Sequence, residues 1–571
     1  MRMKKIWRHN GPKVLGALIL AAASFAMGYR VNDKYFDIAK NLDIFAAVFR
    51  NLNTYYVDSI EPEKLMATGI DAMVGSLDPY TTYYPENDLD ELDFQTTGKY
   101  GGVGLSVREI HDSTVVSDVY KGSPVDLAGI RAGDIILSIS GHNATGLPDE
   151  EISKLLKGEP GTSLQIMLKN PVTGKESTKS ITRQEIDIHS VAYAGMAGDG
   201  IGFIKLTQFT QYSANEVSSA LDSLMHANPA MKGVIIDLRS NPGGLLDEAV
   251  KLSSLFIGGS QVVVSTKGKA SGWNRDYTSG VVAKYPHLPL VVLTNRLSAS
   301  ASEIYAGAMQ DLDRGVILGQ RSFGKGLVQT TRDLPYNTKL KVTVAKYYTP
   351  SGRCIQAIDY AHRNEDGSVD YIPDSLRKSF RTRDGRTVKD GGGIEPDVYL
   401  APDYLSNISV TLLSRDYIFR YATWYYYSHP DLNPSTKTFS ISDSDYNGFI
   451  RFISGKVYEY HTRTQNDLDD LEKAARKENY LDDVKPQLEA LKQQLALEKG
   501  KDLIRYKGEI ENLLNQEIIG RYYLTPGRIA RSLSFDPEVI RARSILRDSS
   551  EYQGIISGRI TELAPVEDPA D

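Results

Sequence analysis

The pattern of apolar and polar positions divides the chain into stretches of different character. Apolar residues recur at helical spacing in residues 44–55, and a second helical pattern runs from about Pro62 to Val74 and stops at Gly75. From Gly98 to about Arg183, short runs that favour strands are separated by glycine turns. We therefore expect a helical region followed by a small β-rich domain.

From Ile201 onward, continuous apolar runs alternate with helical patterns. The runs are Ile201–Leu206, Gly233–Leu238, Gln261–Ser265, Leu290–Thr294 and Gly315–Gly319. Strands that are apolar at every position are typical of a mainly parallel sheet with helices on both faces. This part of the chain predicts a βα-repeat core.

The stretches that remain are less regular. A polar insert at about residues 364–390 is expected to be an exposed loop. From about Ala401 the patterns are amphipathic and helical, which predicts a small helical bundle packed on the core. The tail from Ala564 is expected to be disordered.

Composition limits the class of protein. With 571 residues the chain is too long for one hydrophobic core, and 41% hydrophobic and 24% charged residues are ordinary for a globular protein. The net charge is -6 with no basic block, so nucleic acid is not expected as a partner. The single cysteine, Cys354, allows no intramolecular disulfide, and the nine histidines show no metal-ligand spacing.

The first residues have the pattern of an export signal. Residues 1–9 are basic, and Val14–Met27 is uncharged and mostly apolar. This run is shorter than the roughly 18 to 20 residues that a membrane-spanning helix prefers. We expect residues 1–30 to be a signal peptide or a membrane anchor formed by residues 14–29, with a buried core helix as the alternative. Basic residues before the run place the rest of the chain outside the cytoplasm.

Three serines, Ser298, Ser300 and Ser302, crowd the turn between the apolar strand that ends at Thr294 and the helix that follows. A strand, a turn of small residues and a helix can present a serine as a nucleophile. Ser300 and Glu303 also have the spacing of a capping box, so Ser300 could instead only cap the helix.

A serine hydroxyl is a weak nucleophile until a base takes its proton. No histidine lies between His287 and His362, although a Ser-His pair from more distant residues stays open. Lys325, which lies between two glycines and 25 residues after Ser300, is the alternative base. A lysine base must be neutral, which burial favours, and its apolar neighbours and flanking glycines suit a buried, tightly packed site.

Two motifs in the β-rich stretch carry a family resemblance. Gly102-Val103-Gly104-Leu105 is a glycine-containing loop, and residues 123–136 contain Ser-Pro, Ala-Gly-Ile and Gly-Asp-Ile-Ile. Together they resemble the carboxylate-binding loop and the middle of a PDZ domain. In that family, backbone N–H groups of the loop hold a C-terminal carboxylate and the adjoining strand accepts the peptide. The resemblance implies that residues 102–105 bind a peptide C-terminus.

The serine-lysine segment resembles a second family. Ser298-Ala-Ser-Ala-Ser-Glu-Ile, the lysine of Phe-Gly-Lys-Gly and the glutamine four residues later look like the Ser-Lys C-terminal processing peptidases, also called tail-specific proteases. Asp237-Leu-Arg-Ser-Asn-Pro-Gly-Gly-Leu245 matches their other core motif. The resemblance covers about residues 45–400. It implies a multidomain α/β protein with a crotonase/ClpP-like protease core and an inserted PDZ domain.

The resemblance also implies the roles of individual residues. Ser300 would be the nucleophile, Lys325 the general base and Gln329 the residue that orients the lysine. The implied oxyanion donors are the backbone N–H groups of Ala301 and Gly244, with Gly243 as the alternative to Gly244. Ala301 lies at a helix start, where N–H groups lack partners and the helix dipole favours negative charge. Cys354 stands where the family has a serine, and we assign it no catalytic role.

The pattern and the resemblance together predict five parts. They are a signal peptide or membrane anchor (1–30), an N-terminal helical region (31–97), a PDZ domain (98–185), a serine protease core (186–400) and a C-terminal helical domain (401–571).

The predicted function is that of an exported serine endopeptidase of the periplasm. It would recognise substrate C-termini through the PDZ domain and cleave through a Ser-Lys dyad and an acyl-enzyme, with no metal or other cofactor. The predicted partners are protein or peptide substrates with free, apolar C-termini, and membrane anchoring and a homo-oligomer are further options. A catalytically silent PDZ scaffold of the cell envelope and a Ser-His hydrolase stay open as alternatives.

Overall fold

The structure is a computed structural model that describes residues 35–364 and 366–561. The predicted signal or anchor and the tail from Ala564 lie outside the described residues. In the part of the chain that is described, no helix has both the length and the apolar character needed to cross a membrane. The chain forms two compact units, one made of the chain up to Pro85 with Thr331–Val342, and the other of Glu86–Thr330 with the chain from Thr343 onward.

The first unit is mainly helical. Residues 35–55 form a helix, and α2 spans Pro62–Gly75, as the sequence predicts. A short strand, β1 (Thr82–Tyr84), lies just before Pro85. It pairs antiparallel with residues 339–341 of β18 (Thr338–Tyr348). A strand of three residues carries no periodic signal of its own, and a distant part of the chain supplies its partner.

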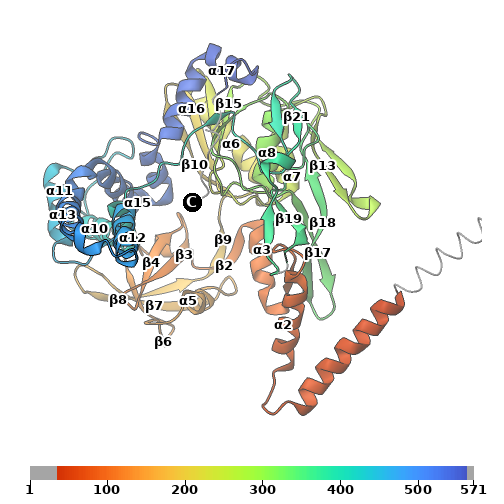
Figure 1. Ribbon diagram of the computed structural model, residues 1–571, viewed down its shortest axis with the longest axis horizontal. Coiled ribbons are helices and arrows are strands. Elements are labelled where there is room, and N and C mark those ends of the chain that lie inside the picture. The colour runs from red at the N-terminus through yellow and green to blue at the C-terminus, as the bar shows by residue number, and fades with distance from the viewer. Residues whose placement is uncertain (1–34, 365, 562–571) are drawn as a thin grey trace, which may run out of the picture. The chain divides into compact units, whose positions relative to one another are not determined.

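The second unit contains the predicted βα-repeat core (Figure 1). The strand order of its sheet is β10-β11-β12-β15-β16-β23, in which β10 is antiparallel and all other neighbours are parallel. The strands are β10 (Val191–Gly198), β11 (Ile201–Leu206), β12 (Gly233–Asp237), β15 (Leu290–Thr294), β16 (Val316–Gly319) and β23 (Val398–Tyr399). Every residue of β12, β15 and β16 is buried, which explains their continuous apolar runs.

Helices cover both faces of this sheet. On one face lie α6 (Ser213–Ala227), α7 (Leu246–Ser254) and α8 (Ala301–Asp311). The other face is covered by the last two helices of the chain, α16 (Pro537–Arg547) and α17 (Ser549–Ile556). Side chains such as Ile545 and Tyr552 share one hydrophobic cluster with Phe203, Ile235 and Leu293 of the strands. The end of the C-terminal helical region is therefore a layer of the core.

Helix α8 is buried over its whole length. One side packs on β16, and another side packs on β13 (Val262–Gly268), which belongs to a second sheet. In that sheet β13 pairs with β14 (Arg275–Thr278) and with residues 345–348 of β18, and β17 (Leu327–Leu334) also pairs with β18. A close-packed interior holds such a helix rigidly.

The β-rich stretch forms an antiparallel sheet in the order β3-β4-β5-β7-β8, with β6 paired to β5. Its elements are β3 (Leu105–Ile110), β4 (Ser113–Val119), α4 (Pro124–Leu127), β5 (Ile135–Ile139), β6 (His142–Asn143), α5 (Asp149–Leu156), β7 (Ser163–Lys169) and β8 (Glu176–Thr182). It is preceded by η1 (Glu86–Asp88) and α3 (Leu89–Thr97). The entering strand β2 (Lys99–Gly102) pairs antiparallel with the leaving strand β9 (Gln184–Asp187), so both ends of the domain join the rest of the unit at one place.

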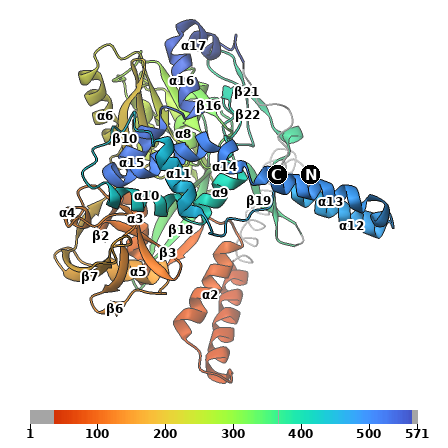
Figure 2. The ribbon, with the colours of Figure 1, turned by 90° about the vertical axis from the view of Figure 1, so that its left-hand side faces the viewer.

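The C-terminal region is helical, as predicted. Its further helices are α9 (Asn407–Ser414), α10 (Tyr417–Ser428), α11 (Asp443–Ile453), α12 (Arg463–Lys477), α13 (Leu481–Lys499), α14 (Asp502–Arg505) and α15 (Lys507–Ser532). Figure 2 shows α12 and α13 side by side, extending away from the other helices. Helix α15 is kinked at Leu524, whose φ of 58° and ψ of -160° are not helical.

The kink of α15 joins the helical region to the β-rich domain. Leu524 packs into the hydrophobic cluster of that domain. Next to it, the Thr525 hydroxyl donates to Oδ2 of Asp118 at 2.8 Å. Arg108 of β3 also forms an ion pair of 2.9 Å with Asp416, the residue just before α10. The helical region therefore contacts both the core sheet and the β-rich domain.

The prediction that residues 364–390 are exposed is confirmed for most of the described residues of this segment, but the segment is not an irregular loop. The segment contributes to two short hairpins, β19 (Ile358–Arg363) with β20 (Val369–Tyr371) and β21 (Ser379–Arg381) with β22 (Thr387–Lys389), separated by η3 (Asp374–Leu376). Arg386 donates to the buried Asp313 at 2.7 Å and pairs with the buried Asp397. One charged residue of this mostly exposed segment thus pairs with two carboxylates of the core.

Replacing Ile545 by alanine should lower the free energy of unfolding by about 2–5 kcal/mol. Ile545 is fully buried between α16 and the sheet. Urea denaturation followed by tryptophan fluorescence measures the change. The control is Ile540→Ala on the same helix, where the side chain is 46% exposed and a change within about 0.5 kcal/mol is expected. Equal losses in the two variants would contradict the packing of α16 on the core.

Candidate functional site

Ser300 stands on a sharp turn between β15 and α8. Its φ of 56° and ψ of -115° cost a non-glycine residue on the order of 1–3 kcal/mol. Its N–H donates to Oε2 of Glu303 at 2.8 Å, and its carbonyl accepts the N–H groups of Glu303 and Ile304 at 2.8 and 2.9 Å. The capping relation between Ser300 and Glu303 is therefore present. Ordinary N-cap residues have extended φ and ψ, so capping alone does not explain the strained backbone.

The structure distinguishes the three serines of the turn. The Ser298 hydroxyl donates to the Leu238 carbonyl at 2.8 Å, and the Ser302 hydroxyl donates to the Asn241 carbonyl at 3.0 Å. Both of these serines are fully buried, whereas Ser300 is only half-buried. The hydroxyls of Ser298 and Ser302 thus bind main-chain carbonyls of the neighbouring loop, and Ser300 is the most exposed of the three serines.

Lys325 lies in the loop before β17, close to this turn. Its N–H donates to Oε2 of Glu303 at 2.8 Å, the same oxygen that accepts from Ser300. The N–H of Gly324 donates to the other carboxylate oxygen at 2.7 Å. One carboxylate thus contacts the main chains of both Ser300 and Lys325. Lys325 itself is half-buried.

The glycines on either side of Lys325 allow this close approach. A Cβ atom on Gly324, which has a φ of +88°, would lie 2.4 Å from the Cβ of Ala357. A Cβ atom on Gly326 would lie 2.8 Å from the backbone nitrogen of Gln356. Both positions require glycine for the loop to pass the neighbouring segment.

Glu303 is a buried carboxylate among hydrogen-bond donors. Besides Ser300, Gly324 and Lys325, the hydroxyl of Ser322 donates to it at 2.5 Å. Burial raises the pKa of Glu303 to about 7, and the four hydrogen bonds oppose that rise. Its spacing from Ser300 predicted the contact with the serine. Nothing in the sequence indicated the contact with the lysine loop.

The Asn-Pro-Gly-Gly loop lies directly against the Ser300 turn. A Cβ atom on Gly243 would lie 2.6 Å from the Ala299 carbonyl oxygen and 2.8 Å from the Cβ of Ser300. The N–H of Gly243 donates to Oδ1 of Asn241 at 2.9 Å. Within residues 35–364 and 366–561, neither the Gly244 N–H nor the Ala301 N–H has a hydrogen-bond acceptor. This pattern favours Gly244 over Gly243 as an oxyanion donor.

Asn241 is a residue that the sequence analysis gave no role. It is fully buried, and its side chain donates to the Leu206 carbonyl at 2.9 Å while it accepts from Gly243. Its own carbonyl accepts the Ala299 N–H at 3.0 Å. Asn241 therefore joins the glycine loop, the strand β11 and the serine turn. Its place just before Pro-Gly-Gly was the only signal of this in the sequence.

Gln329 lies on β17, four residues after Lys325. Its Nε2 donates to the hydroxyl of Thr343 on β18 at 3.1 Å. Its role toward the lysine stays a prediction. Cys354 is half-buried, and burial raises the pKa of its thiol, which keeps the thiol protonated.

The histidines of the core lie away from this turn. His226 and His287 are exposed. His189 faces Glu216, and His362 faces Asp359, both on the surface. No histidine in the described part of the chain forms a hydrogen bond with Ser300. The geometry therefore does not favour a Ser-His pair at Ser300.

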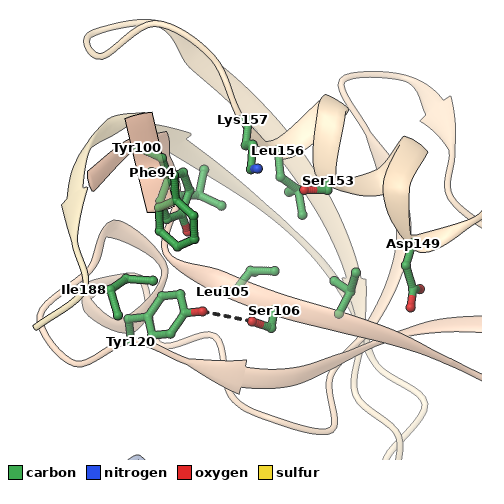
Figure 3. A pocket seen from close by; sticks show the side chains of 12 residues that line it. Phe94, Tyr100, Leu105, Ser106, Tyr120, Asp149, Ser153, Leu156, Lys157 and Ile188 are labelled. Atoms are coloured by element: carbon green, nitrogen blue, oxygen red, sulfur yellow. Dashed lines mark hydrogen bonds between the residues drawn. The ribbon is translucent and has the colours of Figure 1, made fainter. Parts of the chain in front are cut away.

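A second candidate site is a cavity of about 270 Å³ in the β-rich domain (Figure 3). Val103 and Leu105, two of the four residues predicted to bind a peptide, line it together with Leu156 and Lys157 at the end of α5. Gly104 has a φ of +86°, and a Cβ atom there would lie 2.2 Å from the Cβ of Ser123. This glycine therefore sets the shape of the loop.

Two aromatic side chains occupy one end of this cavity. Figure 3 shows Phe94 of α3 and Tyr100 of β2 close together, and their rings meet edge to face with centroids 5.7 Å apart. Burial raises the pKa of the Tyr100 hydroxyl.

Comparison with protein families gives three matches. The model for peptidase family S41 matches residues 200–361, the PDZ domain model matches residues 115–169, and the model described as "Probable PDZ-protease, C-terminal helical domain" matches residues 408–546.

Curated relatives and solved structures extend these matches. The chain is 35% identical to the carboxy-terminal-processing protease of Bartonella bacilliformis over 56% of this chain and 73% of that protein. It is 30% identical to a probable CtpA-like serine protease of Staphylococcus haemolyticus over 60% of this chain and 68% of that protein. Among solved structures, the photosystem II D1 C-terminal processing protease is 28% identical, with a TM-score of 0.33, over 63% of this chain and 93% of that one.

Proposed function

Because the chain belongs to peptidase family S41, we propose that it is a C-terminal processing serine endopeptidase with Ser300 as nucleophile and Lys325 as general base. One observation carries this proposal most directly. The half-buried Ser300 stands on a strained turn, and its N–H and that of Lys325 bind the same oxygen of Glu303. This shared contact supports the proposal that the two residues act together.

The reaction would follow from these positions. Neutral Lys325 takes the proton of the Ser300 hydroxyl as the oxygen attacks a substrate carbonyl carbon. The N–H groups of Ala301 and Gly244 stabilise the oxyanion, and such a donor is worth roughly 10²–10³ in rate. Protonated Lys325 then gives its proton to the nitrogen of the leaving amine. The acyl-enzyme that remains is hydrolysed by water, which regenerates Ser300 and neutral Lys325. In this scheme Gln329 orients the lysine.

Substrate selection would take place at the second cavity. The backbone N–H groups of residues 102–105 bind the free carboxylate of a protein or peptide. Val103, Leu105 and Leu156 offer an apolar surface to its last side chain. The names of the relatives in Bartonella bacilliformis and Staphylococcus haemolyticus agree with a serine protease, and the first of them with carboxy-terminal processing.

We also propose that the enzyme is exported and acts in the periplasm. The basic residues 1–9 and the apolar run Val14–Met27 support this proposal. Residues 14–29 would then anchor it in the inner membrane if they are not removed.

Ser300→Ala and Lys325→Ala should each lower the rate of cleavage by at least about 10³-fold, because each removes one partner of the dyad. The assay follows cleavage of an unfolded protein with an apolar C-terminus by mass spectrometry. Peptide binding measured by anisotropy should remain, and Lys269→Ala, which changes an exposed lysine, is the control. Cleavage by both dyad variants would refute the dyad. Tail binding without cleavage by the unchanged protein would favour the scaffold alternative.

Gly243→Ala should lower kcat by about 10²-fold or more, because the new methyl group would push the glycine loop away from Ser300 and Ala301. Steady-state kinetics on a C-terminally apolar peptide substrate measures kcat and KM. Gly272→Ala is the matched control, since a Cβ atom there meets nothing within 4 Å. A normal kcat for Gly243→Ala would mean that this loop does not serve as the oxyanion hole.

A further inference from the structure

Two side chains contact the main chains of Ser300 and Lys325 at the same time. The first is Glu303, which accepts the N–H groups of both residues at 2.8 Å. The second is Tyr347 of β18, whose hydroxyl lies 2.6 Å from the Lys325 carbonyl oxygen and 3.1 Å from the Ser300 carbonyl oxygen. Tyr347 is only 1% exposed.

We propose that Glu303 and Tyr347 form a backbone clamp that sets the separation of nucleophile and base, and are positioning residues of the reaction. This inference rests on the proposed dyad of Ser300 and Lys325. Glu303 and Tyr347 act through the main chains of Ser300 and Lys325, so their role does not depend on which substrate is bound.

The two halves of the clamp are complementary. The carboxylate accepts N–H groups and the hydroxyl donates toward carbonyl oxygens, so together they bind both polar groups of each peptide segment. A hydroxyl has one hydrogen, which the Lys325 carbonyl receives at the shorter distance. A shift of either main chain changes its hydrogen bonds to both Glu303 and Tyr347.

The cost of burying Glu303 supports a positioning role. An ionised carboxylate inside a protein is expensive unless it is fully hydrogen-bonded. The four donors on Glu303 are neutral groups, and three of them are main-chain N–H groups. Stabilising the helix start needs only the contact with Ser300. The contacts with Ser322, Gly324 and Lys325 serve the lysine loop.

Strand β18 gives the clamp a second connection to the base. The N–H of Tyr347 donates to the Gly326 carbonyl at 2.9 Å, next to Lys325. On the same strand, Thr343 accepts the Gln329 amide at 3.1 Å. The strand thus contacts the lysine loop on both sides of the lysine, which aligns the loop along β18.

The decisive experiment uses Tyr347→Phe in the full-length chain. A fluorophosphonate probe reacts with an activated serine without needing the PDZ domain to capture a tail. We expect the second-order rate constant of Ser300 labelling to fall about 10-fold or more, and kcat for a peptide to fall similarly at unchanged KM. Thermal denaturation checks that the variant is folded.

Tyr305→Phe is the matched control. Tyr305 lies on α8, is fully buried, and its hydroxyl has no hydrogen-bond partner in the described chain. Its removal should leave the labelling rate and kcat unchanged. A merely structural role for a buried tyrosine hydroxyl would not produce a selective loss at Tyr347.

Glu303→Gln is a second test of the clamp. A glutamine amide has one acceptor oxygen, so two of the four donors would face an NH₂ group. Labelling should fall at least as much as in Tyr347→Phe. The control for loss of a buried carboxylate is Glu248→Gln, which changes a residue that binds Ala214 at the start of α6 and should keep the labelling rate.

The outcomes separate the clamp from the dyad. Slow labelling in Lys325→Ala together with normal labelling in a folded Tyr347→Phe would overturn the clamp and leave the dyad intact. Normal labelling in Lys325→Ala would overturn the proposed base, and the clamp with it. The expected result is slow labelling of Ser300 in both Lys325→Ala and Tyr347→Phe, with normal labelling in Tyr305→Phe.

Discussion

The carboxylate of Glu303 is the interaction on which the candidate site depends. Without it, four hydrogen-bond donors would be left in the interior, each at a cost of about 1–3 kcal/mol. The same group holds the strained Ser300 turn and the Lys325 loop. Local strain at a turn persists only where the surroundings determine it from several sides. Three groups surround the Ser300 turn: the Glu303 carboxylate, the Tyr347 hydroxyl and the glycine loop with Gly243.

The rest of the fold keeps these groups in place. Helix α8, which begins at the turn, is enclosed between two sheets and cannot shift without opening a cavity. The loop that carries Gly243 and Gly244 starts at Arg239, which pairs with Asp237 at its own strand end and with Asp536 and Glu538 near the start of α16. Burial disfavours the charge on Asp237, yet Arg239 and Lys205 outweigh that effect and lower its pKa to about 2. Asp237, ionised at neutral pH, holds Arg239, and Arg239 in turn connects the loop to the start of α16.

The sequence predicted the parts of the fold whose signal is local. The uniformly apolar runs at 233–238 and 290–294 became buried parallel strands, and Pro62 and Gly75 mark the bounds of α2. The turn with Ser300 was also identified from strand, small residues and helix. These predictions succeeded because burial and helix termination depend on the residues themselves.

What the sequence could not indicate depends on contacts between distant segments. The roles of Glu303, Asn241 and Tyr347 come from hydrogen bonds to parts of the chain that lie elsewhere in the sequence. The choice of Gly244 over Gly243 rests on which N–H Asn241 already uses. Residues 364–390 were expected to be an exposed loop, and most of them are exposed, but they also form parts of two hairpins, and Arg386 pairs with the buried Asp313.

The pairing of β2 with β9 bears on how this architecture could have arisen. The strands that enter and leave the PDZ domain are antiparallel neighbours, with Gly102 opposite Gln184. Since antiparallel neighbours can be joined by a two-residue turn, the 81 residues between those positions could be exchanged for a hairpin. The core strands would keep their register. The junction is thus a natural point for recombination, where a binding module can be gained, lost or replaced while the hydrolytic unit is inherited whole.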